Sequence, residues 1–226
     1  MTGPSGRAQT RRELSAAALA LFTDRGYEAT TVDQIASTAG VARRTFFRYF
    51  PTKEDAIFPD HDATLARVAA MLESDDGVEP IAAVCQGIHE VLRMYIADPN
   101  VSVARYHLLR DVPVLRDRER AVVSRYQRLF TKHLLKHSAS DSLTGPLLAE
   151  VAAAAVVAAH NHVLRRWLRG GGDGDATAQL EEALQLVRRQ YGHTAPMHGG
   201  RKVIVTVADT DADRESIMDA VFSALD

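Results

Sequence analysis

The sequence predicts an all-α protein: a three-helix head with a helix-turn-helix, then a helical bundle body, then a C-terminal strand-helix extension. Three observations predict this class. Apolar residues recur three and four positions apart over most of the chain, which is the period of amphipathic helices. Glycine residues separate the first short helical segments. A β-branched run typical of a strand, residues 202–207, comes only near the end.

Composition places the chain among ordinary globular proteins. Apolar residues make up 46% of the 226 residues, charged residues 25%, and the formal net charge is −2. A nucleic-acid site must therefore be a local basic patch. No run of about 18 apolar residues predicts a membrane span, and no apolar signal peptide is found, so we expect a cytoplasmic protein without membrane contact. The single cysteine, Cys85, excludes an internal disulfide and a cysteine-built zinc site, and its apolar neighbours predict a core residue.

The head is predicted to cover residues 10–52, after a disordered tail of residues 1–9 rich in glycine, proline and serine. Its first helix ends at Gly26, because glycine commonly closes a helix at this position. The apolar face of this helix is formed by Leu14, Ala18, Leu21 and Phe22.

Two short helices follow in the head. Thr30 or Thr31 is expected to cap the first of them. The second begins near residue 42, and the four-residue spacing of Phe46 and Phe50 turns both rings inward. The same period turns outward the residues Arg43, Arg44, Phe47 and Arg48.

The body is predicted to cover residues 53–192. After a break at Pro51, its first helix is expected over residues 53–72, with Thr52 as N-cap and Asp55 completing an imperfect capping box. The later body helices are predicted over residues 80–97, 101–110, 114–136, 146–169 and 176–191.

Residues 193–226 predict a linker, a strand and an amphipathic helix. A lone strand cannot satisfy its backbone hydrogen-bonding groups, so residues 203–207 need a partner. That partner is either the same strand of a second subunit or another protein, and both alternatives remain open.

Residues 30–53 carry a helix-turn-helix pattern. The two short helices meet at Ala39, Gly40 and Val41, where alanine allows close approach and glycine a sharp turn. In such a motif the second helix lies in the major groove of DNA, where arginine can bond guanine. Residues 7–53 hold eight basic and four acidic residues, so the region is locally positive. The alternative is a plain structural unit whose arginines face solvent.

This region resembles the TetR family of transcriptional regulators over about residues 10–58. The resemblance rests on Leu21-Phe22, Gly26-Tyr27, Thr30-Thr31-Val32, Ile35-Ala36, Ala39-Gly40-Val41, Thr45-Phe46-Phe47, Tyr49-Phe50 and Lys53-Glu54. It implies a homodimeric repressor with a helix-turn-helix head and an all-α body that binds a ligand.

The resemblance also implies which residues contact DNA. Thr31 begins the supporting helix, where family members contact phosphate. Arg43 and Arg44 match positions that read bases. The full predicted set is Thr31, Ala42, Arg43, Arg44, Thr45, Phe47, Arg48, Tyr49 and Lys53.

Besides Thr31, three members of this set are expected to contact phosphate. Tyr49 and Lys53 match such positions in the family. Phe47 departs from the family pattern, because a tyrosine hydroxyl usually contacts phosphate there; Arg48 is expected to take over that contact.

The resemblance further implies a homodimer through residues 146–191, in which two long helices pair with those of the partner. Residues 148–159 are small and apolar, which permits close helix approach. A dimer would place two recognition helices on a palindromic double-stranded operator. The alternative is a monomeric bundle core.

A helical body can hold a mostly apolar cavity with a few polar anchors for a small-molecule effector. The candidate anchors are His89, Arg93, Tyr106, Arg110, Tyr126 and Asn161. Each can instead be a surface group or a satisfied core group. Residues 109–120 and 165–176 are loosely similar to a subgroup containing the mycofactocin-type regulator and fatty acyl-CoA sensors, which implies a lipophilic or acyl-type effector.

Enzymatic, cofactor and metal-binding functions find no support. His160 and His162 are two apart on a helix and point about 200° from one another, so they cannot share a metal. His133 and His137 share a face but lack a third ligand nearby in the sequence. The GxSxG, P-loop and GxGxxG motifs are absent.

We therefore expect a repressor that an effector releases from its operator by swinging the helix of residues 53–72 and separating the two heads. Two alternatives remain. One is a regulator controlled by a protein partner through residues 193–226, and the other is a ligand-binding protein or enzyme that merely retains the head.

Overall fold

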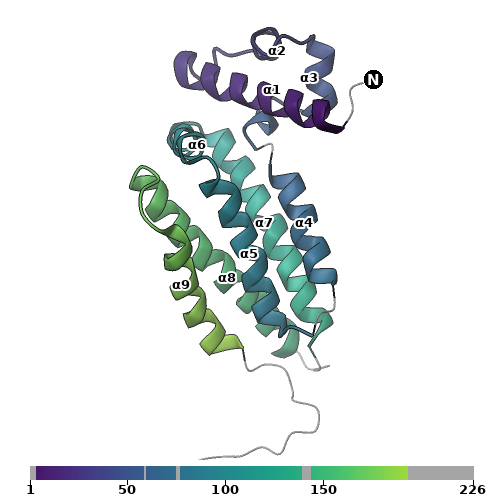
Figure 1. The fold of residues 1–226 in the computed structure, drawn as a ribbon, viewed down its shortest axis with the longest axis vertical. Helices are drawn as coiled ribbons and strands as arrows, with labels where there is room; N and C mark the ends of the chain where they lie inside the picture. Colours follow the sequence, from purple (N-terminus) through teal and green to yellow (C-terminus); the bar gives the residue numbers. More distant parts are fainter. Residues whose placement is uncertain (1–3, 59, 75–76, 139–143, 193–226) are drawn as a thin grey trace, which may run out of the picture. The chain divides into compact units, whose positions relative to one another are not determined.

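The computed structural model describes residues 4–58, 60–74, 77–138 and 144–192, which contain nine α-helices, one 3-10 turn and no strand (Figure 1). The head holds α1 (Pro4–Arg25), α2 (Val32–Thr38), α3 (Arg43–Tyr49) and the 3-10 turn η1 (Asp55–Ile57). The body holds α4 (His61–Glu73), α5 (Pro80–Ile96), α6 (Pro99–Asp111), α7 (Pro113–Lys136), α8 (Thr144–Arg169) and α9 (Ala176–Tyr191). The predicted all-α class is confirmed; the predicted linker, strand and helix of residues 193–226 lie outside the described residues.

The first helix begins at Pro4, so residues 4–9 are helical and the prediction of a disordered tail over residues 1–9 is wrong for them. Polar side chains in this first part bond along the helix: the Thr10 hydroxyl donates to the Gly6 carbonyl at 3.0 Å, and the Gln9 amide to Glu13 at 2.8 Å. The helix ends as predicted at Gly26, whose φ of +84° is a conformation that glycine adopts without a steric penalty.

Thr31, and not Thr30, caps α2. Its side chain accepts from the Gln34 amide while the Gln34 side chain accepts from the Thr31 amide, which completes a capping box. Thr30 is buried and its hydroxyl donates to the Gly26 carbonyl at 2.8 Å. The turn from α2 to α3 passes through Gly40 with φ +67°.

The helix predicted over residues 53–72 begins only at His61, which corrects that prediction. The Thr52 amide and hydroxyl both donate to Asp55 Oδ2, at 3.1 and 3.0 Å, so only the carboxylate half of the expected box forms, and the short turn η1 follows it. Phe58 then leaves the helical region, with φ −121° and ψ 48°. It precedes Pro59 in the sequence, and a proline disfavours helical backbone in the residue before it.

The bounds of α5 to α9 agree with prediction within two residues. Three of these helices start at a proline, which is tolerated in the first turn because its missing N–H would have no helical partner there. These proline residues are Pro80, Pro99 and Pro113.

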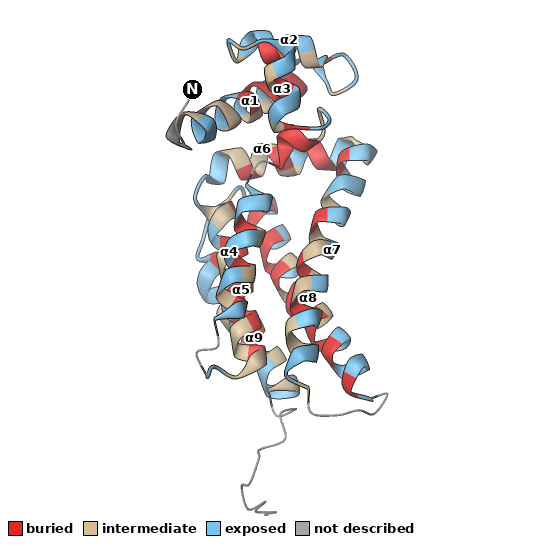
Figure 2. Cartoon of the chain, turned by 90° about the vertical axis from the view of Figure 1, so that its right-hand side faces the viewer, coloured by how far each residue is buried: buried red, intermediate tan, exposed pale blue. Residues whose placement is uncertain are grey.

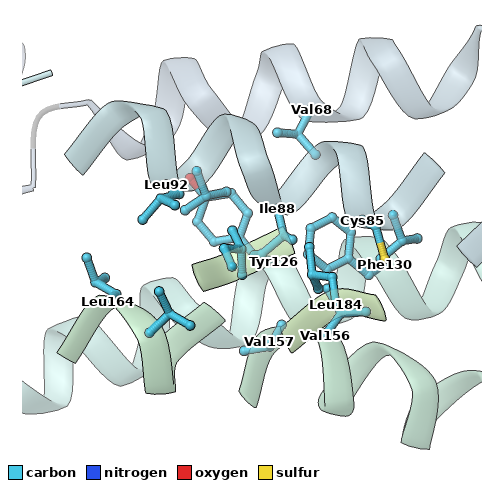
Figure 3. Close-up of a cluster of buried hydrophobic side chains, with 14 of the residues drawn as sticks. Val68, Cys85, Ile88, Leu92, Tyr126, Phe130, Val156, Val157, Leu164 and Leu184 are labelled. Carbon is cyan, nitrogen blue, oxygen red and sulfur yellow. The ribbon is translucent and has the colours of Figure 1, made fainter. Parts of the chain in front are cut away.

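The body core is formed where α5, α7, α8 and α9 turn their buried faces toward one another (Figures 2 and 3). Cys85 is buried in this cluster, as predicted, and burial raises the pKa of its thiol to about 12. Gly87 lets three helices approach closely, because a Cβ there would lie 3.0 Å from Val68 Cγ1 and 3.1 Å from Phe130 Cε1.

The head has a core of its own, centred on buried residues of α1, α2 and α3 such as Phe22, Ile35 and Phe46. The body contributes to it as well. The contributing residues of α6 and α7 are Leu108, Leu109 and Leu115.

One helix among the described residues, α8, is long and apolar enough by composition to span a membrane. It packs against α7 and α9 and buries Val156 and Val157 in the body core. Part of its apolar surface stays exposed, at Leu147, Leu148 and Val151.

Candidate nucleic-acid interface and body cavity

The third helix divides into two faces as predicted. Phe46 and Phe50 are buried, with 0% and 1% of their surface exposed. The residues on the opposite face are exposed: Arg43, Arg44, Phe47 and Arg48. The aromatic pair anchors the helix in the head and leaves three arginines in solvent.

The three arginines differ in what holds them. Arg43 forms an ion pair with Asp33 of α2, and its guanidinium lies 5.4 Å from the centre of the Phe47 ring. The Arg48 guanidinium lies 5.2 Å from the centre of the Tyr49 ring. Arg44 makes no ion pair or hydrogen bond with any other described residue, so its guanidinium is available to a ligand.

The predicted DNA-contacting residues with short side chains lie at the starts of α2 and α3. Thr31 is exposed at the N-cap of α2, and Ala42 is exposed at the N-cap of α3. Thr45 is half-buried in the first turn of α3. Their position beside the exposed arginines fits the predicted DNA surface.

Lys53 is engaged within the protein. Its ammonium donates to the carbonyls of Tyr27 and Thr30, at 2.8 and 3.0 Å, and lies 3.9 Å from the centre of the Tyr27 ring. It thereby fixes the loop between α1 and α2, which does not fit the predicted phosphate contact.

The Tyr49 hydroxyl is buried and has no hydrogen-bond partner among the described residues. The residue lines a cavity of about 100 Å³ between head and body, together with Arg11, Asp55 and His61. This position also disagrees with the predicted phosphate contact, because the hydroxyl does not reach solvent.

Two carboxylates join the head to the body, and the sequence pattern did not single them out for this role. Asp62, the second residue of α4, pairs with Arg11 of α1 at 3.4 Å and with Arg125 of α7 at 2.7 Å. Asp55 of η1 pairs with Arg118 of α7. These bonds cross between elements far apart in sequence.

The body holds a cavity of about 360 Å³ among α4 to α8. Four of the six predicted ligand anchors line it: Tyr106, Arg110, Tyr126 and Asn161. Its apolar wall is formed by Ile88, Val91, Leu109, Val122, Val123, Val157, Leu164 and Leu168, some of which appear in Figure 3.

The other two predicted anchors lie outside the cavity lining. His89 Nε2 is 3.1 Å from Glu181 Oε2, so His89 ties α5 to α9. Arg93 pairs with Glu90 one turn earlier on the same helix. Both are structural contacts.

Three buried polar residues of the lining were missed by the sequence analysis: His61, Tyr95 and His160. His61 Nδ1 is 3.2 Å from the Tyr126 hydroxyl, and His61 Nε2 is 3.2 Å from the Tyr95 hydroxyl. Burial lowers the pKa of His61 to about 3 and that of His160 to about 4, so both rings are neutral. A signal existed for His160, since helical spacing puts it on the face of Val156, Val157 and Leu164.

The exposed part of the lining is basic. Arg116, Arg120 and Arg165 join Arg110 there, and Asp117 pairs with Arg120. The half-buried Glu119 opposes them, and burial raises the pKa of its carboxyl group. The cavity thus has neutral polar groups at its buried side and positive charge at its solvent side.

Two family models match the chain. The model described as "Bacterial regulatory proteins, tetR family" matches residues 14–57, and the one described as "MftR C-terminal domain" matches residues 78–192. The HTH-type transcriptional regulator TcmR of Streptomyces glaucescens is 41% identical over 85 residues, 37% of this chain and 38% of that protein. The putative mycofactocin biosynthesis transcriptional regulator MftR of Mycobacterium tuberculosis is 37% identical over 70 residues, 31% of this chain and 35% of that protein.

Each of these alignments thus spans well under half of the curated relative. Among solved structures, the TetR-family repressor FadR of Thermus thermophilus in complex with lauroyl-CoA is similar, with a TM-score of 0.51 and 22% identity over 85% of this chain and 100% of that one. This similarity extends the shared fold to the body.

Proposed function

This chain belongs to the TetR family of bacterial regulatory proteins, and on that premise we propose that it is a dimeric, cytoplasmic repressor released from a palindromic operator by a small effector. The observation that carries the proposal is Arg44. It is exposed and unpaired among the described residues, on the helix that a helix-turn-helix inserts into the major groove. Its free guanidinium can bond guanine O6 and N7 in bidentate fashion.

The DNA surface is formed by the exposed face of α3 and the start of α2. Arg44 reads a base, and Arg43 joins it once DNA competes with Asp33. Arg48 and Thr31 contact phosphate, and Phe47 packs beside the backbone. Ala42 and Thr45 complete the surface at the start of α3.

The dimer forms through α8 and α9, within residues 146–191. Leu147, Leu148 and Val151 of α8 and Leu186 of α9 are exposed apolar residues that a partner's helices would cover. A two-fold axis through this face gives each dimer two copies of α3, which fits an operator with two half-sites.

The effector acts through α4. His61 lines the body cavity, and the adjacent Asp62 holds Arg11 of the head. An effector that displaces His61 therefore shifts the attachment of the head. Release follows only if the effector binds the DNA-free conformation more tightly than the DNA-bound one.

The effector has a largely apolar body, because most of the buried lining is apolar. An acyl-type compound is one candidate, supported by the related fold solved with lauroyl-CoA.

Selection of bound sequences from a random DNA pool tests the proposal, with wild type and Arg44→Ala in parallel. We expect wild type to recover a palindrome and the variant to lose specificity at one symmetric base pair. Arg12→Ala is the control, since Arg12 is exposed on α1 away from the motif. Recovery of no sequence by wild type, with only weak salt-sensitive binding, would contradict a specific regulator.

A further inference from the structure

The buried side of the body cavity presents hydrogen-bond acceptors. His160 Nδ1 is 3.2 Å from Asn161 Oδ1, and an amide oxygen only accepts, so Nδ1 carries the proton of the neutral ring. His160 Nε2 is then a lone pair. It is buried and has no partner among the described residues, although 96% of the residue's surface is removed from solvent.

Tyr95 adds a second acceptor. The arrangement that makes all three bonds around His61 has Nδ1–H donating to Tyr126, Tyr126 donating to the His61 carbonyl, and Tyr95 donating to Nε2. The Tyr95 hydroxyl has then used its only proton and can only accept. Its ring centre is 6.2 Å from that of His160, so the two rings are neighbours in the cavity lining.

The space and walls favour a compact body with rings. A cavity of about 360 Å³ has the size of a site for a small molecule. Tyr95, Tyr106 and Tyr126 contribute aromatic rings to walls whose other apolar residues are aliphatic. Aromatic side chains favour stacked or edge-on contact with a planar ring.

The solvent side favours an acidic group. The guanidinium groups of Arg110 and Arg165 make no ion pair with any described residue, and both line the cavity. A carboxylate can accept two parallel N–H bonds from one such guanidinium.

We propose that the effector is a compact ring compound with a hydroxyl group at its buried end, which donates its one proton to His160 Nε2, and an acidic group at its solvent end beside Arg110 and Arg165. This assignment deepens the proposed function. It rests on that function in calling the bound compound an effector. An unbranched acyl chain fits less well, because its terminal methyl group cannot donate to the buried acceptors.

The test is calorimetric titration of the full-length protein without DNA. The probes are 6-hydroxy-2-naphthoic acid, its 6-methoxy analogue, which keeps the ring and the acid but has no donor, and decanoic acid. We expect wild type to bind the hydroxy acid at least about tenfold more tightly than the methoxy acid. In His160→Phe that ratio falls to about one, and His160→Gln, which restores an acceptor, recovers part of it.

Three further variants isolate the site. Tyr95→Phe deletes the neighbouring hydroxyl, which does not receive the ligand proton, and is expected to keep the ratio near its wild-type value. His160→Gln keeps the test decisive if His160→Phe is poorly folded in thermal unfolding. His137→Phe is the matched control, since His137 is exposed at the end of α7 and does not line the cavity. Arg165→Ala is expected to weaken both naphthoic acids equally.

Equal binding of the hydroxy and methoxy acids by wild type, tighter binding of decanoic acid, or binding of none of the probes would overturn the assignment. Operator selection is scored separately. If the protein binds its operator but does not prefer the hydroxy acid, only this inference is contradicted. If it prefers the hydroxy acid but binds no operator, the proposed regulatory function is contradicted.

Discussion

His61 Nδ1 lies 3.2 Å from the hydroxyl oxygen of Tyr126, so the first residue of α4 is fastened to α7 on the wall of the body cavity. The next residue, Asp62, bonds the head through Arg11 and the body through Arg125. Of these two adjacent residues, His61 lines the cavity and Asp62 holds the head, and the first prediction concerns Asp62.

Asp62→Asn is expected to weaken the link between cavity and head while leaving stability nearly intact. Both of its ion pairs are partly exposed, so the free energy of unfolding should fall by less than about 1 kcal/mol. With a probe that releases wild type from the operator, the ratio of operator Kd values with and without probe should move toward one. Glu90→Gln, which breaks a pair within α5 outside the cavity lining, is the control and should leave the ratio unchanged.

Asp33→Asn is expected to raise DNA affinity about two- to fivefold at low salt, because it frees Arg43 and removes a negative charge beside the phosphates. Fluorescence anisotropy with a labelled operator would measure it. Asp24→Asn, at the end of α1, is the matched head variant and should have no such effect. An unchanged affinity in Asp33→Asn would mean that Arg43 does not reach DNA.

Lys53→Met is expected to destabilise the protein by about 1–2 kcal/mol, because the Tyr27 and Thr30 carbonyls lose a charged donor. Urea unfolding would measure this loss. The dependence of log K for DNA on log salt should keep its slope, whereas Arg48→Met should reduce that slope by about one. A reduced slope in Lys53→Met would restore the phosphate contact that the family resemblance implies.

Stability is expected to fall as the pH drops below about 6.5. His61 and His160 have folded pKa values of about 3 and about 4, whereas an unfolded histidine titrates near 6.5. Between these pKa values the unfolded state binds a proton at each histidine that the folded state does not bind. Each histidine therefore lowers the free energy of unfolding by about 1.4 kcal/mol for every pH unit of acidification. Glu119, whose pKa burial raises, opposes part of this loss.

Urea unfolding at pH 7.0 and 5.5 would measure the net change, which we expect to be about 2 kcal/mol. His160→Phe should remove about half of the contribution of His61 and His160, and His107→Phe, at an exposed position of α6, should leave the change intact. A pH-independent stability in wild type would show that neither ring is held neutral.

Leu148→Glu is expected to produce monomers and to abolish high-affinity operator binding, because a charge would be buried in the proposed interface. Light scattering after size-exclusion chromatography would give the mass. Val114→Glu, at an equally exposed apolar position on α7, should remain dimeric. A dimeric Leu148→Glu protein would place the interface elsewhere.

Helices whose ends carry strong local signals were predicted well. The proline at the start of α5 and the aspartate cap of α9 act within one turn, and both starts were predicted correctly. The start of α4 was not, because the Thr52 amide bonds the Asp55 carboxylate ahead of a 3-10 turn as readily as ahead of an α-helix. Capping chemistry alone does not say how long the helix after it will be.

The site was predictable to the extent that it lies on one helix. The inward and outward faces of α3 follow from periodicity, since Phe46 and Phe50 define them. The cavity joins residues from different helices, such as His61 of α4, Tyr95 of α5 and His160 of α8. Spacing within one helix does not tell which faces of separate helices meet. The bonds of Lys53 to the Tyr27 and Thr30 carbonyls also join segments far apart in the sequence, so the spacing did not predict them.

Leu108, Leu109 and Leu115 of the body complete the hydrophobic core of the head, and this limits how the chain can be recombined. A fragment ending after η1 would expose the surface that these leucines cover. Domain exchange between relatives would work best if the corner between α6 and α7 travelled with the head, even though it lies some fifty residues further along the chain. The unit that must be exchanged as a whole is therefore discontinuous in sequence. A chimaera joined directly after η1 should be poorly soluble.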